Sequence, residues 1–567
     1  MDIDYKLSQI NLEILKIKQA SIIKNFLINI PEDKILILDK NANNIINGII
    51  NSSELKKVYG VKEIFYTDNF PKYKEKYYIY FVFSTLESIL FINNYRDFFV
   101  NSNNKHKMCF LEKRNMNVEI DLHFNEMWDH VDVFELIIEM IPIENDIINM
   151  YMANSIRKIF IDQNIKYIKH VVKCIEIIQR LYGKIPNITA FGNTSIKIKN
   201  AIIEENKINK YEETQINKLI IFDRTIDTIT PCLTQLVYEG AIDEIFGIVN
   251  SKIKLENDYV PLHSGYQYYL DIRDKHINVS KILLKTHSDC YNLKNINIIQ
   301  YTETPDNETQ QFLLNIVKQN KIHTDYLYKH VAIHNILSKK INSGFFKNTL
   351  AIEKSIMITQ INLNPIQTFF SNITDDIEIE LFNYIDKSIS NGESIYYILG
   401  CISLYFQICG CRMTKKGYGN LMSTLDDKYN CYKIINHMEK LEIMKKKEIT
   451  INKSSYINGK TINDTNNIYT FNKLLNKLDL IQEIDLNTPN QQTLHYLYGG
   501  YAPISGQLIQ NEIKNNNTNN NIINKNVTLI CFVGGCTYSE IIACRSFSNI
   551  IILTTEIFNK QQFFDSM

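Results

Sequence analysis

The segment from Lys218 to Gly247, KLIIFDRTIDTITPCLTQLVYEGAIDEIFG, constrains the fold of this 567-residue chain more than any other. Its residues 219–222 form a continuous apolar run, which is typical of a strand buried on both faces of a parallel sheet. Thr230 is a helix N-cap residue and Pro231 a first-turn proline, so we expect a helix to begin at Pro231. A strand followed so closely by a helix favours an α/β domain.

A second strand signal lies near the end of the chain. Residues 527–533 (VTLICFV) are apolar, a Gly534-Gly535 turn follows, and Thr537 and Glu540 have the spacing of a capping box. Residues 550–555 then supply another strand, so this segment predicts a βαβ unit within a parallel sheet. If that unit pairs with the strand at 219–222, one domain is discontinuous and the region between its two segments is inserted into it.

The first 125 residues alternate apolar runs with helical patterns. Strands are expected at 35–39, before Asp68, at 77–83 and near Cys109. Such alternation predicts a parallel sheet with helices on both faces. Residues 248–490 are mostly helical in pattern, with a Lys/Asn/Ser/Thr-rich linker expected from Lys445 to Asn467.

Composition excludes several classes of protein. Lys and Arg total 62 and Asp and Glu total 62, so the chain has no net field that would attract nucleic acid or an anionic membrane. Eleven scattered cysteines without a CxxC pair indicate reduced thiols in a cytosolic protein. The N-terminal residues MDIDYKLSQI lack the features of a signal peptide.

Two further stretches have an unusual composition. The apolar run from Ile395 to Cys411 is short for a bilayer, and we expect a helix buried inside a large domain. The Asn-rich stretch from Asn511 to Asn526 cannot bury enough apolar area to offset ordering, so we expect a solvated loop of unassigned function.

The best candidate for chemistry is the end of the strand at 219–222. Asp223 and Asp227 occupy the strand end where open α/β sheets bind ligands, and an enzyme would use them to hold a metal with Arg224 on a phosphate. No base, histidine or phosphate loop lies nearby in the sequence. We therefore favour a structural role in which the three side chains hold the turn by hydrogen bonds and an ion pair.

Three other patterns resemble ligand sites only in part. Gly534 and Gly535 precede a helix but lack the third glycine of a dinucleotide fingerprint and the lysine of a P-loop, which favours tight strand-to-helix packing. The Walker-like stretch 454–461 (SSYINGKT) follows no strand, and we interpret it as chance. His330 and His334 have zinc-ligand spacing, but no HExxH glutamate or cysteine cluster completes the set. We expect no catalytic residue, no metal and no cofactor.

Four segments resemble the signatures of the Sec/Munc (SM) family. They are LIIFDRTIDTITPCLTQLVYEGAIDEIFG, LYGKIPNITAFG at 181–192, YGGYAPIS at 498–505 and FVGGCTYSEI at 532–541. GCRMTKKGYGNLMSTLDDKYNCYKIINHMEKLEIM adds a closer likeness to the vacuolar-sorting branch of that family. The resemblance covers essentially the whole chain, with Cys536 where an aliphatic residue is usual, an expanded Asn-rich loop and a weak match over the first 30 residues.

The resemblance implies a three-domain arch with two parallel-sheet α/β domains and a largely helical inserted domain. We expect an N-terminal domain at 1–135, a discontinuous second domain at 136–247 and 491–567, and a third domain at 248–490. It also implies a protein that is not an enzyme and that templates the assembly of SNARE helices. A helical hairpin between Thr309 and Met357 would take an amphipathic helix into a groove.

The resemblance further implies a subunit of HOPS- or CORVET-like tethering complexes, docked onto a vacuolar protein sorting-associated protein 16 type partner. The helix at 395–411 and the segment to Met444 would form or support that interface. The expected location is cytoplasmic, peripheral on late endosome and vacuole- or lysosome-type membranes. The alternatives are an α/β nucleotide-binding ATPase and an SM protein of another trafficking step.

Two sets of residues follow from the resemblance. The expected SNARE contacts are Phe312, Ile316, His323, Tyr328, His330 and Phe346. The structural signature comprises Asp223, Arg224, Asp227, Thr230, Pro231, Glu239, Asp243, Glu244, Gly534, Gly535, Thr537 and Glu540.

Overall fold

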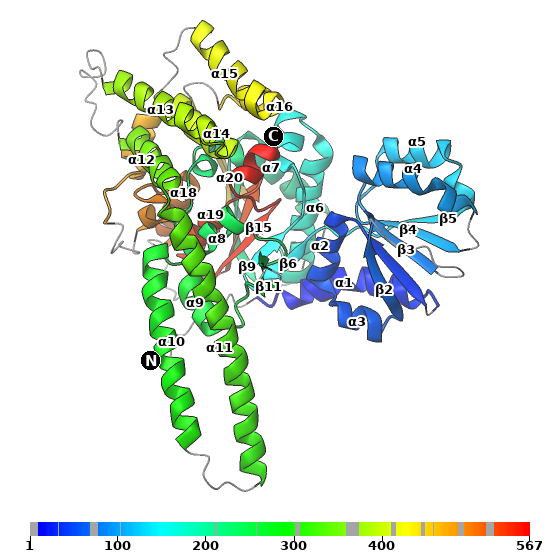
Figure 1. Cartoon of the computed structure of the whole chain (residues 1–567). Coiled ribbons are helices and arrows are strands. Elements are labelled where there is room, and N and C mark those ends of the chain that lie inside the picture. The colour runs from blue at the N-terminus through cyan, green and yellow to red at the C-terminus, as the bar shows by residue number, and fades with distance from the viewer. Residues whose placement is uncertain are drawn as a thin grey trace.

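The apolar runs of the first 135 residues form a five-stranded parallel sheet in the order β2-β1-β3-β4-β5 (Figure 1). Its strands are β1 (Lys34–Leu38), β2 (Val61–Tyr66), β3 (Tyr77–Val82), β4 (Lys105–Phe110) and β5 (Val131–Glu135), and its connecting helices are α2 (Lys40–Ile49), α3 (Ser52–Lys57), α4 (Leu86–Asn101) and α5 (Met116–Phe124). Leu36 and Leu38 enter one buried cluster and Ile35 and Ile37 another, so both faces of the sheet are covered.

The computed structural model describes residues 10–567 except 32, 69–76, 102–103, 210, 212–213, 257, 301–306, 359–372, 410–414, 444–447, 458, 486–492 and 518–526. Part of the expected Asn-rich loop, 518–526, therefore lies outside the described residues. Its first part is helical, because α18 (Ile504–Asn517) continues through it.

A second sheet of eight strands has the order β13-β12-β8-β9-β14-β15-β7-β6. The five parallel strands are β8 (Asn187–Phe191), β9 (Ile216–Asp223), β14 (Val527–Val533), β15 (Ile550–Thr554) and β7 (Ile147–Asn149), and β6 (Ile141–Glu144) is an antiparallel edge. Leu529 of β14 lies opposite Leu219 of β9. Two segments some 300 residues apart in sequence thus share one sheet, which is the pairing that makes this part of the chain discontinuous.

The other edge of this sheet corrects the linker expected at Lys445 to Asn467. β12 (Glu448–Ile457) and β13 (Lys460–Thr470) form an antiparallel hairpin, and β12 pairs with β8. Backbone hydrogen bonds hold such a ladder whatever its side chains are, so a polar composition does not reveal it. The Walker-like stretch lies within this hairpin, not between a strand and a helix.

The helix expected at Pro231 is also wrong. Only a single turn, η4 (Thr230–Cys232), forms there, and the helix α8 (Tyr238–Phe246) begins seven residues later. Thr230 does not cap a helix because its amide and its hydroxyl both donate to the carboxylate of Asp227, at 2.9 and 2.5 Å. The chain remains extended at Leu233 and Val237 before α8 starts.

Helices cover the second sheet and build the rest of the molecule. Next to the sheet lie η2 (Arg157–Ile161), α6 (Ile165–Tyr182), α7 (Asn193–Ile208), η3 (Arg224–Ile226), η6 (Leu494–Tyr498), α19 (Tyr538–Arg545) and α20 (Lys560–Asp565). The N-terminal helix α1 (Glu13–Ile28) joins the two sheets, since Leu15 packs in the core of the second and Ile23 and Leu27 in that of the first.

The helical region begins with a small hairpin, β10 (Lys252–Leu255) and β11 (Asp258–Pro261), and a short helix, α9 (Gln267–Arg273). It continues with α10 (Ile277–Gln300), α11 (Asn307–Ile341), α12 (Gly344–Ile358), α13 (Ile373–Ser390), α14 (Ile395–Ile408), α15 (Lys415–Tyr429), α16 (Tyr432–Lys440) and α17 (Phe471–Leu478). The apolar helix α14 is buried, as predicted from its composition, and packs in the largest core cluster. None of the helices described here is long and apolar enough to cross a membrane.

Candidate partner-binding hairpin and its support

Two long helices, α10 and α11, leave the body of the molecule as a projecting hairpin (Figure 1). α11 has 35 residues, which at 1.5 Å per residue is about 50 Å of helix. The helical pattern of the sequence from Asn307 to Ile341 is therefore one continuous helix. The hairpin starts at Ile277, earlier than the expected Thr309, and α12 is a separate helix that packs on the body.

The base of the hairpin is anchored by an apolar and aromatic cluster. Leu327, Ile333 and Leu337 of α11 pack with Tyr238 of α8 and Tyr269 of α9. Because all of these side chains are buried, the root of the hairpin is fixed to the segment that carries the Lys218–Gly247 signature.

His330 and His334 belong to this base. The Tyr238 hydroxyl lies 2.9 Å from His330 Nδ1, and His334 Nε2 lies 2.9 Å from the carbonyl oxygen of Ile277. Burial lowers the pKa of His330 to about 3, so its ring is neutral at physiological pH. Their spacing on one face of the helix serves the packing of α8, α10 and α11.

The structure places the expected SNARE contacts in different environments. Tyr328 is 49% exposed on α11, and His323 is half-buried. Phe312 and Ile316 lie on α11, but their side chains lie outside the described residues. His330 and Phe346 are 0% and 1% exposed, so the prediction that they touch a partner does not fit this conformation.

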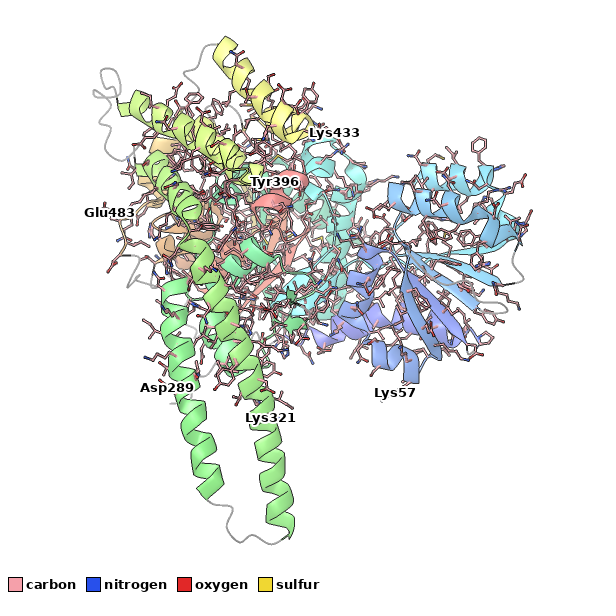
Figure 2. All side chains as sticks on the ribbon, in the orientation of Figure 1. Lys57, Asp289, Lys321, Tyr396, Lys433 and Glu483 are labelled. Carbon is pink, nitrogen blue, oxygen red and sulfur yellow. The ribbon has the colours of Figure 1, made fainter. Side chains whose placement is uncertain are left out.

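Sequence reasoning missed three other exposed apolar residues on the hairpin. Ile282 of α10 is 62% exposed, and Ile322 and Ile336 of α11 are 58% and 40% exposed. Ile322 and Ile336 are separated by about four helical turns, so they lie on one face of α11. Their spacing indicates a shared helix face but does not separate them from their buried neighbours. Figure 2 shows Asp289 and Lys321 on the projecting legs of the same hairpin.

The signature residues lie beneath the hairpin and hold the two segments of the second sheet together. Asp223 accepts hydrogen bonds from the amide of Thr194 and from the amide and hydroxyl of Thr225, at 2.8–3.0 Å. Its loop approaches Gly192 so closely that a Cβ there would lie 2.3 Å from Asp223 Cβ, at a φ of +98°. Asp223 therefore holds the turn after β9 and also binds the start of α7.

Arg224 forms an ion pair with Glu540, in which Nη2 and Oε1 are 2.7 Å apart and both side chains are buried. Arg224 also donates to the carbonyl oxygen of Asp227. The carboxylate of Asp227 in turn accepts from the amide of Ile504, at 3.1 Å. The contacts with Glu540 and Ile504 join the 218–247 segment to the C-terminal segment.

The two glycines after β14 do not form a phosphate cradle. Their amides donate to the hydroxyl of Thr555, at 3.1 Å for Gly534 and 2.8 Å for Gly535. A Cβ on Gly535 would lie 2.3 Å from the ring of Phe558. The following helix begins with the predicted capping box of Thr537 and Glu540. The glycines thus serve close packing, and the amides that an ATPase would turn to phosphate are already bonded.

Two buried cations that sequence reasoning did not single out complete this support. Arg545 binds Glu239, Asp146 and Asp274 at 2.6–3.0 Å. Lys560 of α20 binds Glu353 of α12 at 2.8 Å. The signal available in the sequence was a lone cation beside apolar residues, in YSEIIACR and KQQFFD.

A model of the Sec1 family matches residues 34–566. The chain belongs to the Sec1 family. The resemblance seen in its motifs is thereby confirmed.

Several named proteins are similar to this Sec1-family chain along most of its length. The vacuolar protein-sorting-associated protein 33 homolog of Arabidopsis thaliana is 23% identical over 97% of this chain and 96% of its own. Vacuolar protein sorting-associated protein 33A of Drosophila melanogaster is 24% identical over 77% and 78%. The likeness to the vacuolar-sorting branch therefore extends through all parts of the fold.

Two solved structures show the same fold. One is the SM protein Vps45 in complex with the Qa SNARE Tlg2, with a TM-score of 0.56, 14% identity and coverage of 98% of this chain and 97% of that chain. The other is the Unc18–syntaxin 1 complex from Monosiga brevicollis, with a TM-score of 0.56, 15% identity and 99% coverage of both chains. The predicted fold class, a Sec/Munc-type arch, is confirmed.

Proposed function

We propose that this Sec1-family protein is not an enzyme but a template on which SNARE helices assemble before vesicles fuse. The observation that carries the proposal is the projecting hairpin of α10 and α11, which exposes Ile282, Ile322 and Ile336 while its base is fixed in the body. Exposed apolar residues at helical spacing fit the apolar face of an amphipathic helix. Similar structures contain a Qa SNARE or a syntaxin, which supports this choice of partner.

The mechanism is physical. SNARE segments are disordered before they pair, and each loses conformational entropy when it becomes helical. A rigid hairpin that holds one segment raises the effective concentration of the next beside it. The protein lowers the barrier to nucleation and forms no covalent bond.

We further propose that the protein works within HOPS- or CORVET-like tethers on late endosome and vacuole- or lysosome-type membranes. The relatives named vacuolar protein sorting-associated protein 33 support this step. A vacuolar protein sorting-associated protein 16 type subunit would dock on the α15–α16 side of the helical region. The buried helix α14 would support that surface from beneath, since its residues lie in the core.

The test is co-purification of the tagged protein from its own cells after mild crosslinking, with the partners identified by mass spectrometry. The wild type should recover SNAREs together with other tether subunits. The double variant Ile322→Asp/Ile336→Asp should lose the SNAREs and keep the tether subunits. Ile208→Asp is the matched control, because Ile208 is 80% exposed on α7 of the body.

Two results would contradict the proposal. If the double variant recovered as much SNARE protein as the wild type, these hairpin residues would not be part of the SNARE-binding surface. Recovery of a single syntaxin-type SNARE without tether subunits would assign the protein to another branch of the family and exclude the docking partner.

A further inference from the structure

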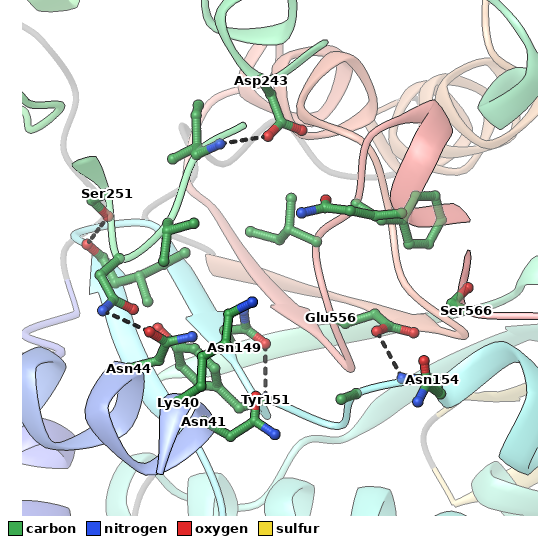
Figure 3. A pocket seen from close by; sticks show the side chains of 18 of the residues that line it. Lys40, Asn41, Asn44, Asn149, Tyr151, Asn154, Asp243, Ser251, Glu556 and Ser566 are labelled. Carbon is green, nitrogen blue, oxygen red and sulfur yellow. Dashed lines mark hydrogen bonds between the residues drawn. The ribbon is translucent and has the colours of Figure 1, made fainter. Parts of the chain in front are cut away.

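A cavity of about 420 Å³ lies where the two sheets meet (Figure 3). Asn149 and Glu556 stand at or just beyond the carboxyl ends of the neighbouring parallel strands β7 and β15. Lys40 and Asn44 of α2 line it from the first sheet, and Asp243 of α8 closes it from the helical side. The carboxyl end of a parallel sheet is the usual place for a ligand in an α/β protein.

The wall of this cavity contains a buried acceptor that no described residue satisfies. Asp243 is 1% exposed, and one of its carboxylate oxygens accepts the amide of Ile248 at 2.9 Å. The other oxygen, Oδ2, has no hydrogen-bond donor among the described residues. Figure 3 shows the carboxylate with one oxygen directed to that backbone nitrogen and the other turned away from it. When Asp243 is ionised, a buried carboxylate oxygen without a donor is costly, so a ligand that supplies a donor at this position would stabilise the ionised form.

A second acceptor lines the same cavity. The side-chain Nδ2 of Asn250 donates to Asn44 Oδ1 at 3.1 Å and so connects the two halves of the wall. Asn250 Oδ1 is buried and has no donor among the described residues. Two unsatisfied oxygens on one cavity call for a ligand that carries several N–H or O–H groups.

The ionisable groups around the cavity are mostly carboxyl groups. Among the described lining residues these are Asp243, Glu556 and Asp565, and the cation is Lys40, which is exposed. The remaining titratable side chains of the lining are tyrosines, Tyr151 and Tyr538. Besides burial, Glu244 and Glu239 of the same helix also raise the pKa of Asp243, and Arg545 is paired with Glu239. A ligand cation would stabilise the ionised form of these carboxyl groups, whereas an anion would not.

A metal ion fits less well than an organic cation. The described residues contain no group of three or more His, Cys, Asp or Glu side chains that could hold a metal. Apolar side chains such as Ile248 and Phe558 make up part of the lining and suit a carbon chain. We propose that this cavity binds a small organic cation with an ammonium or guanidinium group, which donates to Asp243 Oδ2 and Asn250 Oδ1.

The site makes a specific prediction about protons. Burial raises the pKa of Asp243 to about 8, and burial also raises that of Glu556. At pH 7 Asp243 therefore holds a proton in the unliganded protein. A bound cation favours the carboxylate, so binding should release a proton to the solvent.

The experiment is isothermal titration calorimetry of the full chain with butylguanidinium, butylammonium and butylurea. Butylurea has the shape of butylguanidinium without its charge. The two cations should bind at least tenfold more tightly than butylurea. Repeating the titration in buffers with different ionisation enthalpies should show release of up to one proton per cation bound.

Two variants address the acceptors separately. Asp243→Asn keeps the oxygen that accepts from Ile248 and should weaken cation binding at least tenfold and abolish proton release. Asn250→Gly removes the second acceptor at a residue whose φ is +54°, which glycine adopts freely, and should weaken binding severalfold. The matched control is Asp97→Asn on α4, where the side chain is 90% exposed and outside the cavity lining.

Each remaining outcome overturns the proposal. No heat and no shift in melting temperature with 10 mM cation would mean that the cavity does not bind this class. If butylurea bound as tightly as the two cations, the charge of the ligand would have no role in binding. Undiminished binding to both cavity variants would place the cation elsewhere on the protein.

Discussion

Replacing Arg224 by methionine should destabilise the second sheet strongly, because it removes the cation from a buried ion pair. Arg224 and Glu540 have side chains 3% and 0% exposed, with their charged atoms 2.7 Å apart. In Arg224→Met the Glu540 carboxylate keeps the hydroxyl of Ser505 and the amide of Thr537 as donors. It has lost its counter-charge, and breaking one side of a buried pair costs about 3–5 kcal/mol.

The assay is urea denaturation followed by circular dichroism, combined with hydrogen exchange of the β9 and β14 amides. Arg96→Met is the matched control, since its pair with Glu126 is 37% and 78% exposed and is expected to be worth about 1 kcal/mol or less. The double variant Arg224→Met/Glu540→Gln should recover about 2 kcal/mol, because glutamine retains the capping hydrogen bonds without a charge. A loss below about 1 kcal/mol in the single variant, or no recovery in the double, would refute the role given to this pair.

Two further predictions concern single side chains. Gly535→Ala should lower the free energy of unfolding by more than about 2 kcal/mol in a denaturation experiment, because its φ is +80° and the new Cβ would overlap a phenyl ring. Gly419→Ala on α15, which has open space around it, should be neutral or stabilising. Equal effects of the two substitutions would contradict this prediction. Without added cation, the melting temperature of Asp243→Asn should rise relative to that of the wild type as the pH is raised from 5 to 8. The pKa of Asp243 is raised in the folded protein, so the unfolded chain loses this proton at a lower pH than the folded chain does. Wild-type stability therefore falls as the pH rises from 5 to 8, and the variant lacks this loss. A difference in melting temperature that stays constant over this range would contradict the prediction.

The sequence predicted the parts of the fold that depend on apolar side chains. Continuous apolar runs form the strand at 219–222, the strands of the terminal βαβ unit and the helix α14. Their composition predicts burial, and they are buried. The capping box of Thr537 and Glu540 was visible because both of its side chains are local in sequence.

Elements fixed by long-range contacts were not visible. The β12–β13 hairpin is held by backbone pairing to β8, some 260 residues earlier, so its polar sequence predicted a linker. Thr230 and Pro231 have the pattern of a helix start. However, the amide and hydroxyl of Thr230 both donate to Asp227, and the helix begins only at Tyr238. In this case a local side-chain hydrogen bond between residues three positions apart outweighed the helix propensity.

The candidate site divides in the same way. His330 has a plausible surface spacing on α11, yet it is buried because α8 and α9 pack over that face. The amphipathic pattern of a helix shows which face is apolar, but not whether another helix covers it. Ile322 and Ile336 are apolar residues that remain exposed, and only the packed structure separates them from their buried neighbours Leu327 and Leu337.

The buried charges of the body help to hold the long hairpin in place. Arg224, Arg545 and Lys560 each bind a carboxylate supplied by a distant part of the chain. Such pairs add little net stability over apolar packing, but a mismatched arrangement would leave a charge buried alone at a cost of several kcal/mol. These pairs therefore favour one relative placement of the sheet, α8 and α12. The root of the hairpin is attached to α8 through the contact of Tyr238 with His330. The template role proposed above requires a binding surface in one fixed orientation, and we expect these pairs to contribute more to that orientation than to net stability.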